Sequence, residues 1–505
     1  MFDGKLEGDL NMKKRFFGLG LITVAATLLL TGCSGGKDSA NDELYIFNTK
    51  SEISDSLKNL AKDYEKESGI KVKTFSPGSG ADVTETMNTE MTSKNAPAIF
   101  ATNSLVTWGP KDGDFMFNLN DATNKELKKL ANEVPENMRL RADDKTNFGL
   151  PYTMEGYGYI VDTNVLADLF PNVKTDEILK DLKTVNYEEF NDFTNKVNDF
   201  IQNNTTATVT LNGHKYELAK EKTELTKGLT GIFVEAGAEK WTYSDHMINV
   251  AMNTVYTSYS DALYSKPKKF AEMKDALVKY MEVLEYNTSH AAGTDTPLKR
   301  GADFINGTEG SYDNSLQLFA DHKGVFIKQG NWIYPTLNKL NKEMLATLDI
   351  IPIKMPFADS DIKIDGWKSQ DFNQTIPEFV PNYWIINKQV SKEKIKKAED
   401  FLVWLYTSDR GLKFLKDESG FILFNDLENS EGSNTLNKAL VEYAKTGKTL
   451  SNPFNASPGN FLEFVGNELK ENYMTKANWD ESTYPDFADK IIKKWEELKA
   501  DSSYD

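Results

Sequence analysis

The sequence contains a single cysteine, Cys33, among 505 residues. One thiol cannot form an internal disulfide, and it cannot build a cysteine-based metal site. Histidine is nearly as scarce, because only positions 214, 246, 290 and 322 carry it, without an H-E-x-x-H motif or a ligand-like spacing. No metal site is therefore predicted, and no motif indicates a bound cofactor.

Positive charge is also in deficit. The formal net charge is −17, and the basic residues form no stripe and do not alternate with aromatic residues. Nucleic-acid binding requires a basic face that releases counterions from phosphates, so nucleic acid is excluded as a ligand. Beyond Leu30 no apolar run approaches the length needed to span a bilayer.

The one substantial apolar run lies near the start of the chain. From Met12 the sequence reads "MKKRFFGLGLITVAATLLLTGC", with basic residues first and then a largely apolar run from Phe16 to Leu30. This run is short for a membrane-spanning helix and is followed by small residues, an order typical of a secretory signal. Residues 1–11 are polar, and we expect Met12 to be the true start codon.

The end of this segment, Leu30-Thr31-Gly32-Cys33, resembles the lipobox of bacterial lipoproteins. The resemblance implies cleavage before Cys33 and acyl chains on its sulfur, which would anchor the chain at a membrane. We expect the anchored protein to lie at the outer face of the cytoplasmic membrane of a bacterium, and specifically of a Gram-positive bacterium. The alternative is an uncleaved membrane helix followed by an incidental thiol.

The mature part of the chain is too long for one compact core, so at least two domains are expected. After a polar tether at 34–43, "LYIFN" predicts a buried strand. The next segment predicts a helix with Leu57, Leu60, Ala61 and Tyr64 on its inner face, ended by Gly69. A polar helix near 82–93 and the strand "AIFATN" repeat the pattern, which favours an α/β sheet.

Ligands of such sheets lie beyond the carboxyl ends of the strands. Residues 49–52 and 103–108, with Glu52, Asn103 and Trp108, follow two strands and are therefore expected at a site. The stretch "GLPYTMEGYGYIVDTNVL" then predicts a strand that crosses into a second lobe. Further on, Asn212-Gly213 predicts a type I′ hairpin within a segment near 203–240 that looks inserted.

Together these features resemble the carbohydrate-binding lipoproteins of ABC importers, the maltose-binding-like group of extracellular solute-binding proteins (family 1). The residues that carry the resemblance stand in order along the chain: the lipobox, "SGIKV", "LPYTMEGYGYIVDTNVL", "GVFIKQGNW" and "IINKQVSKEKIKKAEDFLVWLYTSDRG". The resemblance implies an α/β, two-lobe periplasmic-binding-protein fold of type II, with hinge-connected lobes and a ligand cleft between them. Members of this group are binding proteins without enzymatic activity, and a monomer is expected.

The expected organisation assigns most of the chain to one of the two lobes. It consists of the signal (1–33), the tether (34–43), lobe I (44–152 and 377–430), lobe II (153–376) and a C-terminal helical part, mainly in lobe II (431–505).

The resemblance also indicates site residues. Gly330-Asn331-Trp332 matches the turn whose aromatic ring stacks on a sugar, and Glu155 falls at the crossover carboxylate. Sugars offer an apolar C–H face and a rim of hydroxyls, which suits the rings and polar groups of Trp332, Tyr157, Trp108, Glu155, Glu52, Asn103 and Asn331. Trp367 and Tyr383 are further candidates. Each of these can instead be an ordinary packing or surface residue.

The sequence thus predicts a lipid-anchored protein that captures a di- or oligosaccharide and delivers it to the permease of an ABC-type importer. Other functions remain open at this point. The same fold could bind a polyamine or another non-sugar solute, because an acidic protein with an aromatic cleft can hold an amine by cation–π contact. A surface adhesin and a glycoside hydrolase are more remote alternatives.

Overall fold

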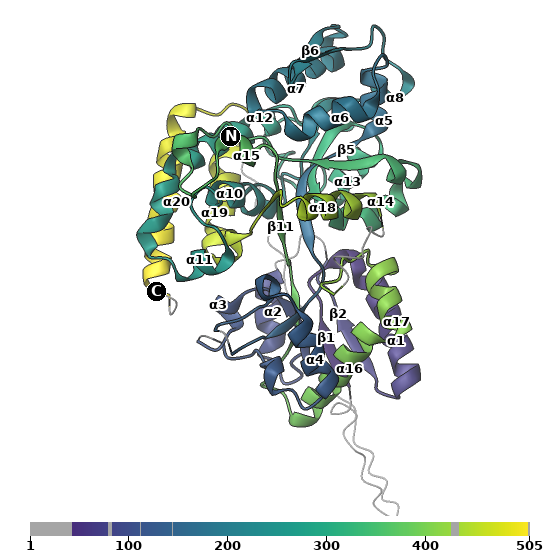
Figure 1. Ribbon diagram of the computed structural model, residues 1–505, viewed down its shortest axis with the longest axis vertical. Coiled ribbons are helices and arrows are strands. Elements are labelled where there is room, and N and C mark those ends of the chain that lie inside the picture. Colours follow the sequence, from purple (N-terminus) through teal and green to yellow (C-terminus); the bar gives the residue numbers. More distant parts are fainter. Residues whose placement is uncertain (1–42, 79–82, 112, 144, 426–433, 503–505) are drawn as a thin grey trace, which may run out of the picture. The chain divides into compact units, whose positions relative to one another are not determined.

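The computed structural model describes residues 43–78, 83–111, 113–143, 145–425 and 434–502 (Figure 1). Residues 1–33, Cys33 among them, and nearly all of the expected tether lie outside the described residues. Among the described residues, no helix combines the length and the apolar character that crossing a membrane requires.

The first sheet has five strands in the order β2-β1-β3-β12-β4. Its members are β1 (Leu44–Phe47), β2 (Val72–Phe75), β3 (Ile99–Thr102), β4 (Gly149–Pro151) and β12 (Tyr383–Ile386). β1 lies parallel to both β2 and β3, whereas β12 runs antiparallel to β3 and β4. β1 and β3 read as nearly continuous apolar segments and are buried along their whole length, whereas β2, at the edge of the sheet, is partly exposed. We call the part of the chain built on this sheet lobe I.

Helices of lobe I follow the predicted apolar spacing. α1 (Ser54–Ser68) buries the four residues predicted for its inner face, and Gly69 ends it with a left-handed φ of 74°. α16 (Lys392–Thr407) buries Ala398, Phe401, Leu402 and Leu405, as expected, while Ile395 is only partly buried. The other α-helices of this lobe are α2 (Val83–Met91), α3 (Leu105–Trp108), α4 (Lys125–Glu133) and α17 (Asp409–Lys413).

The second sheet has the order β13-β11-β5-β9-β8, and β10 also pairs with β5. Its members are β5 (Glu155–Asp162), β8 (Gly231–Val234), β9 (Gly324–Gly330), β10 (Leu348–Ile351), β11 (Ile376–Phe379) and β13 (Thr449–Leu450). β5 is the centre of the sheet, because it pairs antiparallel with β9, β10 and β11 and is buried throughout. We call the part built on this sheet lobe II.

Helices surround this second sheet (Figure 1). They are α5 (Thr163–Leu169), α6 (Thr175–Thr184), α7 (Tyr187–Asn203), α8 (Glu224–Lys227), α9 (Lys240–Tyr243), α10 (Asp245–Met252), α11 (Tyr259–Tyr264), α12 (Lys274–Ser289), α13 (Tyr312–Ala320), α14 (Tyr334–Leu340), α15 (Ser369–Phe372), α18 (Thr435–Lys445), α19 (Phe461–Leu469) and α20 (Tyr484–Ala500). The amphipathic C-terminal helix predicted from the sequence is α20. Its Trp495 is fully buried and stacks on Phe270 at 4.2 Å between ring centroids.

The predicted hairpin is confirmed. β6 (Thr208–Leu211) and β7 (His214–Glu217) are joined by Asn212 and Gly213, whose φ values of 51° and 82° are those of a type I′ turn. Val209 and Tyr216 face each other on the buried side. Within the segment near 203–240 that looks inserted, β8 is a strand of the second sheet, parallel to β9.

Three chain segments connect the two sheets. Residues 152–154 join β4 to β5, residues 380–382 join β11 to β12, and residues 419–424 leave lobe I in the direction of α18. They are hydrogen-bonded to one another: the Tyr152 amide donates to the Asn382 carbonyl at 2.9 Å, and the Met154 amide donates to the Ile422 carbonyl at 3.0 Å. In return the Ile422 amide donates to Thr153 Oγ1 at 2.8 Å. Such short tied segments between lobes are the usual structure of a hinge.

Candidate functional site

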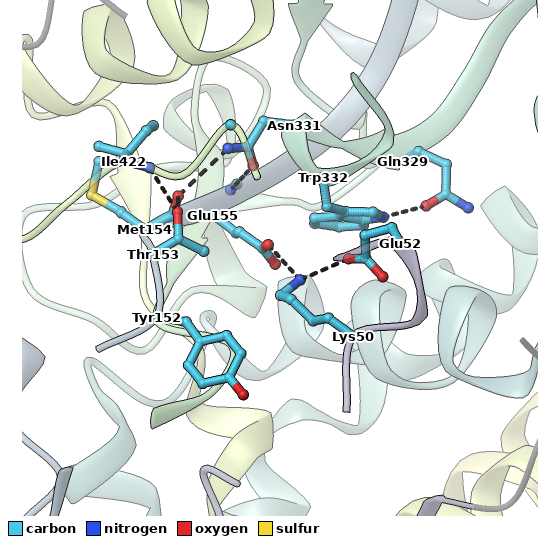
Figure 2. Close-up of polar contacts among 12 residues, drawn as sticks. Lys50, Glu52, Tyr152, Thr153, Met154, Glu155, Gln329, Asn331, Trp332 and Ile422 are labelled. Carbon is cyan, nitrogen blue, oxygen red and sulfur yellow. Dashed lines mark hydrogen bonds and ion pairs between the residues drawn. The ribbon is translucent and has the colours of Figure 1, made fainter. Parts of the chain in front are cut away.

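Trp332 lies where β9 ends and the short helix η6 (Asn331–Ile333) begins. Its indole is half-buried, and its Nε1 donates to Gln329 Oε1 at 3.0 Å (Figure 2). The ring packs against His246 at 5.3 Å and Trp241 at 6.2 Å between centroids. These contacts hold the indole in one orientation and leave part of it accessible.

The glycine before this turn has a packing reason. A Cβ at Gly330 would lie 2.1 Å from Cζ3 of Trp332 and 2.4 Å from the carbonyl oxygen of Gly156. Neither distance is possible for a real side chain, and the second involves backbone that cannot move aside. The indole therefore rests on the bare backbone of Gly330, which explains the small residue in "GNW".

The charged part of the site centres on Lys50. This residue follows β1, and its Nζ lies 2.6 Å from Glu155 Oε1 and 3.1 Å from Glu52 Oε1 (Figure 2). Glu155 is the first residue of β5, so the ion pair joins the segment after the carboxyl end of β1, in the first sheet, to the start of β5, in the second. Lys50 is 8% exposed and Glu155 3% exposed. Buried charges at this spacing must be paired to be tolerated.

The pKa values of the buried pair reflect this balance. Burial alone would lower the pKa of Lys50, but the charges of Glu155 and Glu52 outweigh it and raise the pKa above its ordinary value. Burial raises the pKa of Glu155, the Lys50 ammonium opposes that rise, and the Glu52 charge adds to it. One ammonium and two carboxylates leave the group with one net negative charge when all three are ionised.

Asn331 and Tyr157 hold the Trp332 turn in place through hydrogen bonds and ring packing. Asn331 accepts from the Gly156 amide at 3.1 Å and donates to Asn437 Oδ1 at 2.8 Å, so it fastens η6 to β5 and α18. Tyr157 is fully buried, and its hydroxyl donates to the His246 carbonyl at 2.8 Å. Its ring stacks on the His246 imidazole at 4.0 Å. Both residues position Trp332 and present no free surface of their own.

The structure therefore brings together Trp332, Glu155 and Glu52, with Asn331 and Tyr157 behind them. It does not bring Trp108, Tyr383 and Trp367 into this group. Trp108 is buried against Phe100 and Phe115, with ring centroids 6.0 Å and 5.4 Å away.

Tyr383 is buried, and its hydroxyl donates to the Met138 carbonyl at 2.9 Å. Trp367 packs edge-on against Phe372 at 5.6 Å. Asn103 is half-buried directly after β3, at the sheet edge where it was expected, and Cys33 lies outside the described residues.

Three residues of the site were not predicted from the sequence: Lys50, Trp241 and His246. Lys50 falls within the 49–52 segment expected at the site, yet a lysine there gives no chemical signal until its two carboxylates are known. Trp241 and His246 come from α9 and α10, far from Trp332 in sequence, and no periodicity links them. Among the described residues, no three His, Cys, Asp or Glu side chains gather in a way that could hold a metal ion.

Comparison with known proteins identifies the family. The model of the bacterial extracellular solute-binding proteins matches residues 59–431. The chain belongs to this family. The members of this family are binding proteins that act outside the cytoplasm. A search of curated proteins gave no match.

Solved structures of solute-binding proteins share the fold. An ABC transporter solute-binding protein from Thermotoga lettingae TMO, bound with α-D-tagatose, is 12% identical, with a TM-score of 0.59 over 90% of this chain and 99% of that one. A chitin oligosaccharide binding protein is 15% identical, with a TM-score of 0.59 over 91% and 99%.

A Streptococcus pneumoniae solute-binding protein in complex with the blood group A-trisaccharide is 15% identical, with a TM-score of 0.55 over 90% of this chain and 100% of that one. These likenesses confirm the predicted two-lobe α/β fold of an extracellular solute-binding protein.

Proposed function

We propose that this solute-binding protein captures a di- or oligosaccharide outside the cell and delivers it to an ABC-type importer. Lipid on Cys33 would hold it at the outer face of the membrane, and it would act as a monomer. One observation carries the choice of cargo. Gly330, which precedes the Trp332 turn, pairs with Tyr157 of β5, so the half-buried indole lies at the same end of β5 as Glu155 and the Lys50–Glu155–Glu52 group that links the two sheets (Figure 2).

A sugar matches these groups chemically. The indole face packs on the apolar C–H face of a pyranose, and hydroxyls around the ring donate to carboxylate oxygens and accept from an ammonium. Each carboxylate is bonded to Lys50 through its Oε1, so the Oε2 atoms of Glu155 and Glu52 remain as acceptors for hydroxyls. Specific sites are built in this way, from apolar surface and a few fixed polar groups.

The ion pairs support binding over hydrolysis. A glycoside hydrolase needs one protonated and one ionised carboxyl on either side of the scissile bond. Here the Lys50 ammonium lies between the two carboxylates and bonds both, at 2.6 Å and 3.1 Å, so a cation occupies the place where a scissile bond would have to lie. We therefore propose that the protein has no enzymatic activity.

The same arrangement disfavours a polyamine. An amine ligand would use the carboxylates and the indole, but the Lys50 ammonium already stands between Glu155 and Glu52. A second cation there would meet like charge in a buried place. The solved structures named above include a protein bound with α-D-tagatose, a chitin oligosaccharide binding protein and a complex with the blood group A-trisaccharide, and their shared fold agrees with a sugar as the cargo.

The test is the thermal midpoint of residues 34–505 with a panel of monosaccharides, oligosaccharides, polyamines and short peptides. A ligand at a hundredfold excess over its Kd stabilises the folded protein by about 2.7 kcal/mol. We expect a shift with one class of oligosaccharide that Trp332→Ala abolishes. Trp367→Ala is the matched control, because that half-buried tryptophan lies outside the site, and it should preserve the shift.

Other outcomes would contradict the proposal. A shift with polyamines alone would keep the fold and overturn the cargo. No shift with any compound would remove the case for a transported solute and favour a surface adhesin. Shortened products after incubation with an oligosaccharide would show catalysis.

A further inference from the structure

The chain contains two asparagines that are followed directly by glycine, in the pairs Asn212–Gly213 and Asn306–Gly307. An asparagine can react with the amide nitrogen of the next residue, when that nitrogen attacks the side-chain carbonyl carbon, Cγ. A glycine in the next position favours this reaction, because it has no Cβ to obstruct the approach and adopts backbone conformations that other residues avoid. The structure places the two pairs in different surroundings.

The side-chain oxygen of Asn306 is fixed, whereas its side-chain nitrogen is weakly held. Oδ1 accepts from the amides of Thr308 and Glu309, each at 2.8 Å. A side chain bonded to the second and third residues ahead folds back over the peptide between them, so Cγ lies beside the nitrogen of Gly307. Nδ2 lies 3.5 Å from Asp303 Oδ1, a length at which a hydrogen bond is weak.

These contacts match what the reaction needs. When the Gly307 nitrogen attacks Cγ, negative charge develops on Oδ1, and two amide N–H groups already point at that atom. Donors arranged in advance stabilise such a charge, as they do in an oxyanion hole. The leaving group is Nδ2, which few bonds retain. Gly307 is exposed, and even a Cβ there would meet no atom within 4 Å, so the turn has room to adjust.

Asn212 shows the opposite arrangement. Its Nδ2, the atom that would have to leave, donates to Thr184 Oγ1 at 2.9 Å and to the carbonyl and Oδ1 of Asp181, both at 3.3 Å. Its amide donates to Glu189 Oε2 at 2.9 Å. The type I′ turn also holds Asn212 and Gly213 at positive φ between two paired strands. The reaction at Asn212 would first have to break these bonds.

The Asn306 turn lies beside elements that support the site. The Gly310 amide donates to the Asn306 carbonyl at 3.2 Å, and the Gly310 carbonyl accepts from the Ala238 amide at 2.9 Å. Ala238 leads into α9, which carries Trp241, and the ring of Trp241 lies 6.2 Å from that of Trp332. A change in the backbone at Asn306 would therefore act on a turn that is bonded to the segment before α9.

We propose that Asn306 is a site of self-modification, at which the chain converts the asparagine to aspartate and isoaspartate without an enzyme. The Gly307 nitrogen forms a bond to Cγ, the Cγ–Nδ2 bond breaks, and ammonia leaves with the proton of the Gly307 amide, which gives a cyclic succinimide. Water then opens the ring at Cγ, which yields aspartate, or at the main-chain carbonyl, which yields isoaspartate. Neither step involves a bound ligand, so the conversion is independent of the proposed cargo.

The experiment incubates the purified protein at mildly alkaline pH and digests samples briefly with trypsin at successive times. Mass spectrometry with fragmentation then follows the peptides 301–323 and 197–215, which contain the two asparagines. In the folded protein, Asn306 should convert from amide to carboxyl at least about tenfold faster than Asn212, since only Asn306 has donors on Oδ1 and a weakly held Nδ2. In urea, which removes both sets of hydrogen bonds, the two rates should agree within about threefold.

Two variants complete the test. Gly307→Ala should slow the conversion of Asn306 by about tenfold, because a Cβ obstructs the attacking nitrogen. Thr308→Ser is the matched control, since it keeps the amide that donates to Oδ1, and it should leave the rate unchanged. Equal rates at the two asparagines of the folded protein, a faster reaction at Asn212 or no conversion at Asn306 would overturn the proposal. An unchanged rate in Gly307→Ala would exclude attack by the Gly307 nitrogen and overturn it as well.

Discussion

Replacing Lys50 by methionine tests whether the ion pairs of Lys50 are needed to stabilise the folded protein with Glu155 buried. The side chains of Lys50 and Glu155 are 9% and 4% exposed, so the variant leaves a carboxylate buried without its ammonium. Removing one partner of a buried pair costs about 3 to 5 kcal/mol. Glu52, whose side chain is 12% exposed, can be hydrated more easily, and the loss falls mainly on Glu155.

The pH dependence follows from the direction of each pKa shift. The folded-state pKa of Lys50 is raised above its ordinary 10.5, so its stabilisation is complete below 10.5 and is lost only at more alkaline pH. The pKa of Glu155 is already raised by burial above its ordinary 4.5 and rises further without Lys50. The folded variant then holds a proton that the unfolded chain releases, so its stability falls as pH rises above 4.5.

The assay is the free energy of unfolding in urea for Lys50→Met, Glu155→Gln and the double variant, at pH values of about 5 and 8. We expect Lys50→Met to lose more stability at the higher pH. The double variant has no charge left from this pair. Its loss of stability should therefore be smaller than the sum of the two single losses by about 2 kcal/mol. Additive losses that are equal at both pH values would refute the reasoning.

Three further predictions concern other parts of the chain. Gly330→Ala should lower the free energy of unfolding by about 1 to 3 kcal/mol, because of overpacking, and should shift the fluorescence of Trp332. Gly307→Ala is the control, since its Cβ would meet open space, and it should change the free energy of unfolding by less than about 0.5 kcal/mol. Equal effects of the two substitutions would contradict the packing argument. Burial raises the pKa of Asp245 from 3.8 to about 7, so its contribution to stability is present below 3.8 and is lost as pH rises towards 7. Asp245→Asn should flatten that decline in urea unfolding, and an unchanged slope would exclude this carboxyl as its cause. Cys33→Ala should abolish the incorporation of labelled fatty acid into the chain in cells; incorporation that persists in the variant would contradict lipid anchoring through this thiol.

Local elements were predictable because their signals are local. The spacing of Leu57, Leu60, Ala61 and Tyr64 defines one face of a helix, and all four are buried in α1. The Asn212–Gly213 pair is sufficient for a type I′ turn because both residues tolerate positive φ. In these segments neighbours in sequence are also the partners in structure.

The site was less predictable because its contacts connect distant residues. Trp332 and Glu155 could be expected from motifs, but the partner of Glu155 is Lys50, more than a hundred residues earlier in the chain. The aromatic residues behind Trp332 come from α9 and α10, and Trp108, although it follows β3 as expected, turns into the core between Phe100 and Phe115. Position at a strand end predicts nearness to a site, and it does not predict where the side chain points.

The position of Glu155 suggests how binding and closure are coupled. It follows directly on the 152–154 connection, where Thr153 Oγ1 accepts from the Ile422 amide at 2.8 Å and Met154 donates to the Ile422 carbonyl at 3.0 Å. Its ion pair reaches Lys50, just beyond the carboxyl end of β1 in the first sheet. A ligand bonded to both residues would contact each lobe immediately beside the hinge, so a small rotation there changes its contacts. Such a ligand binds one arrangement of the lobes more tightly than another, which is the condition for shifting the population towards it.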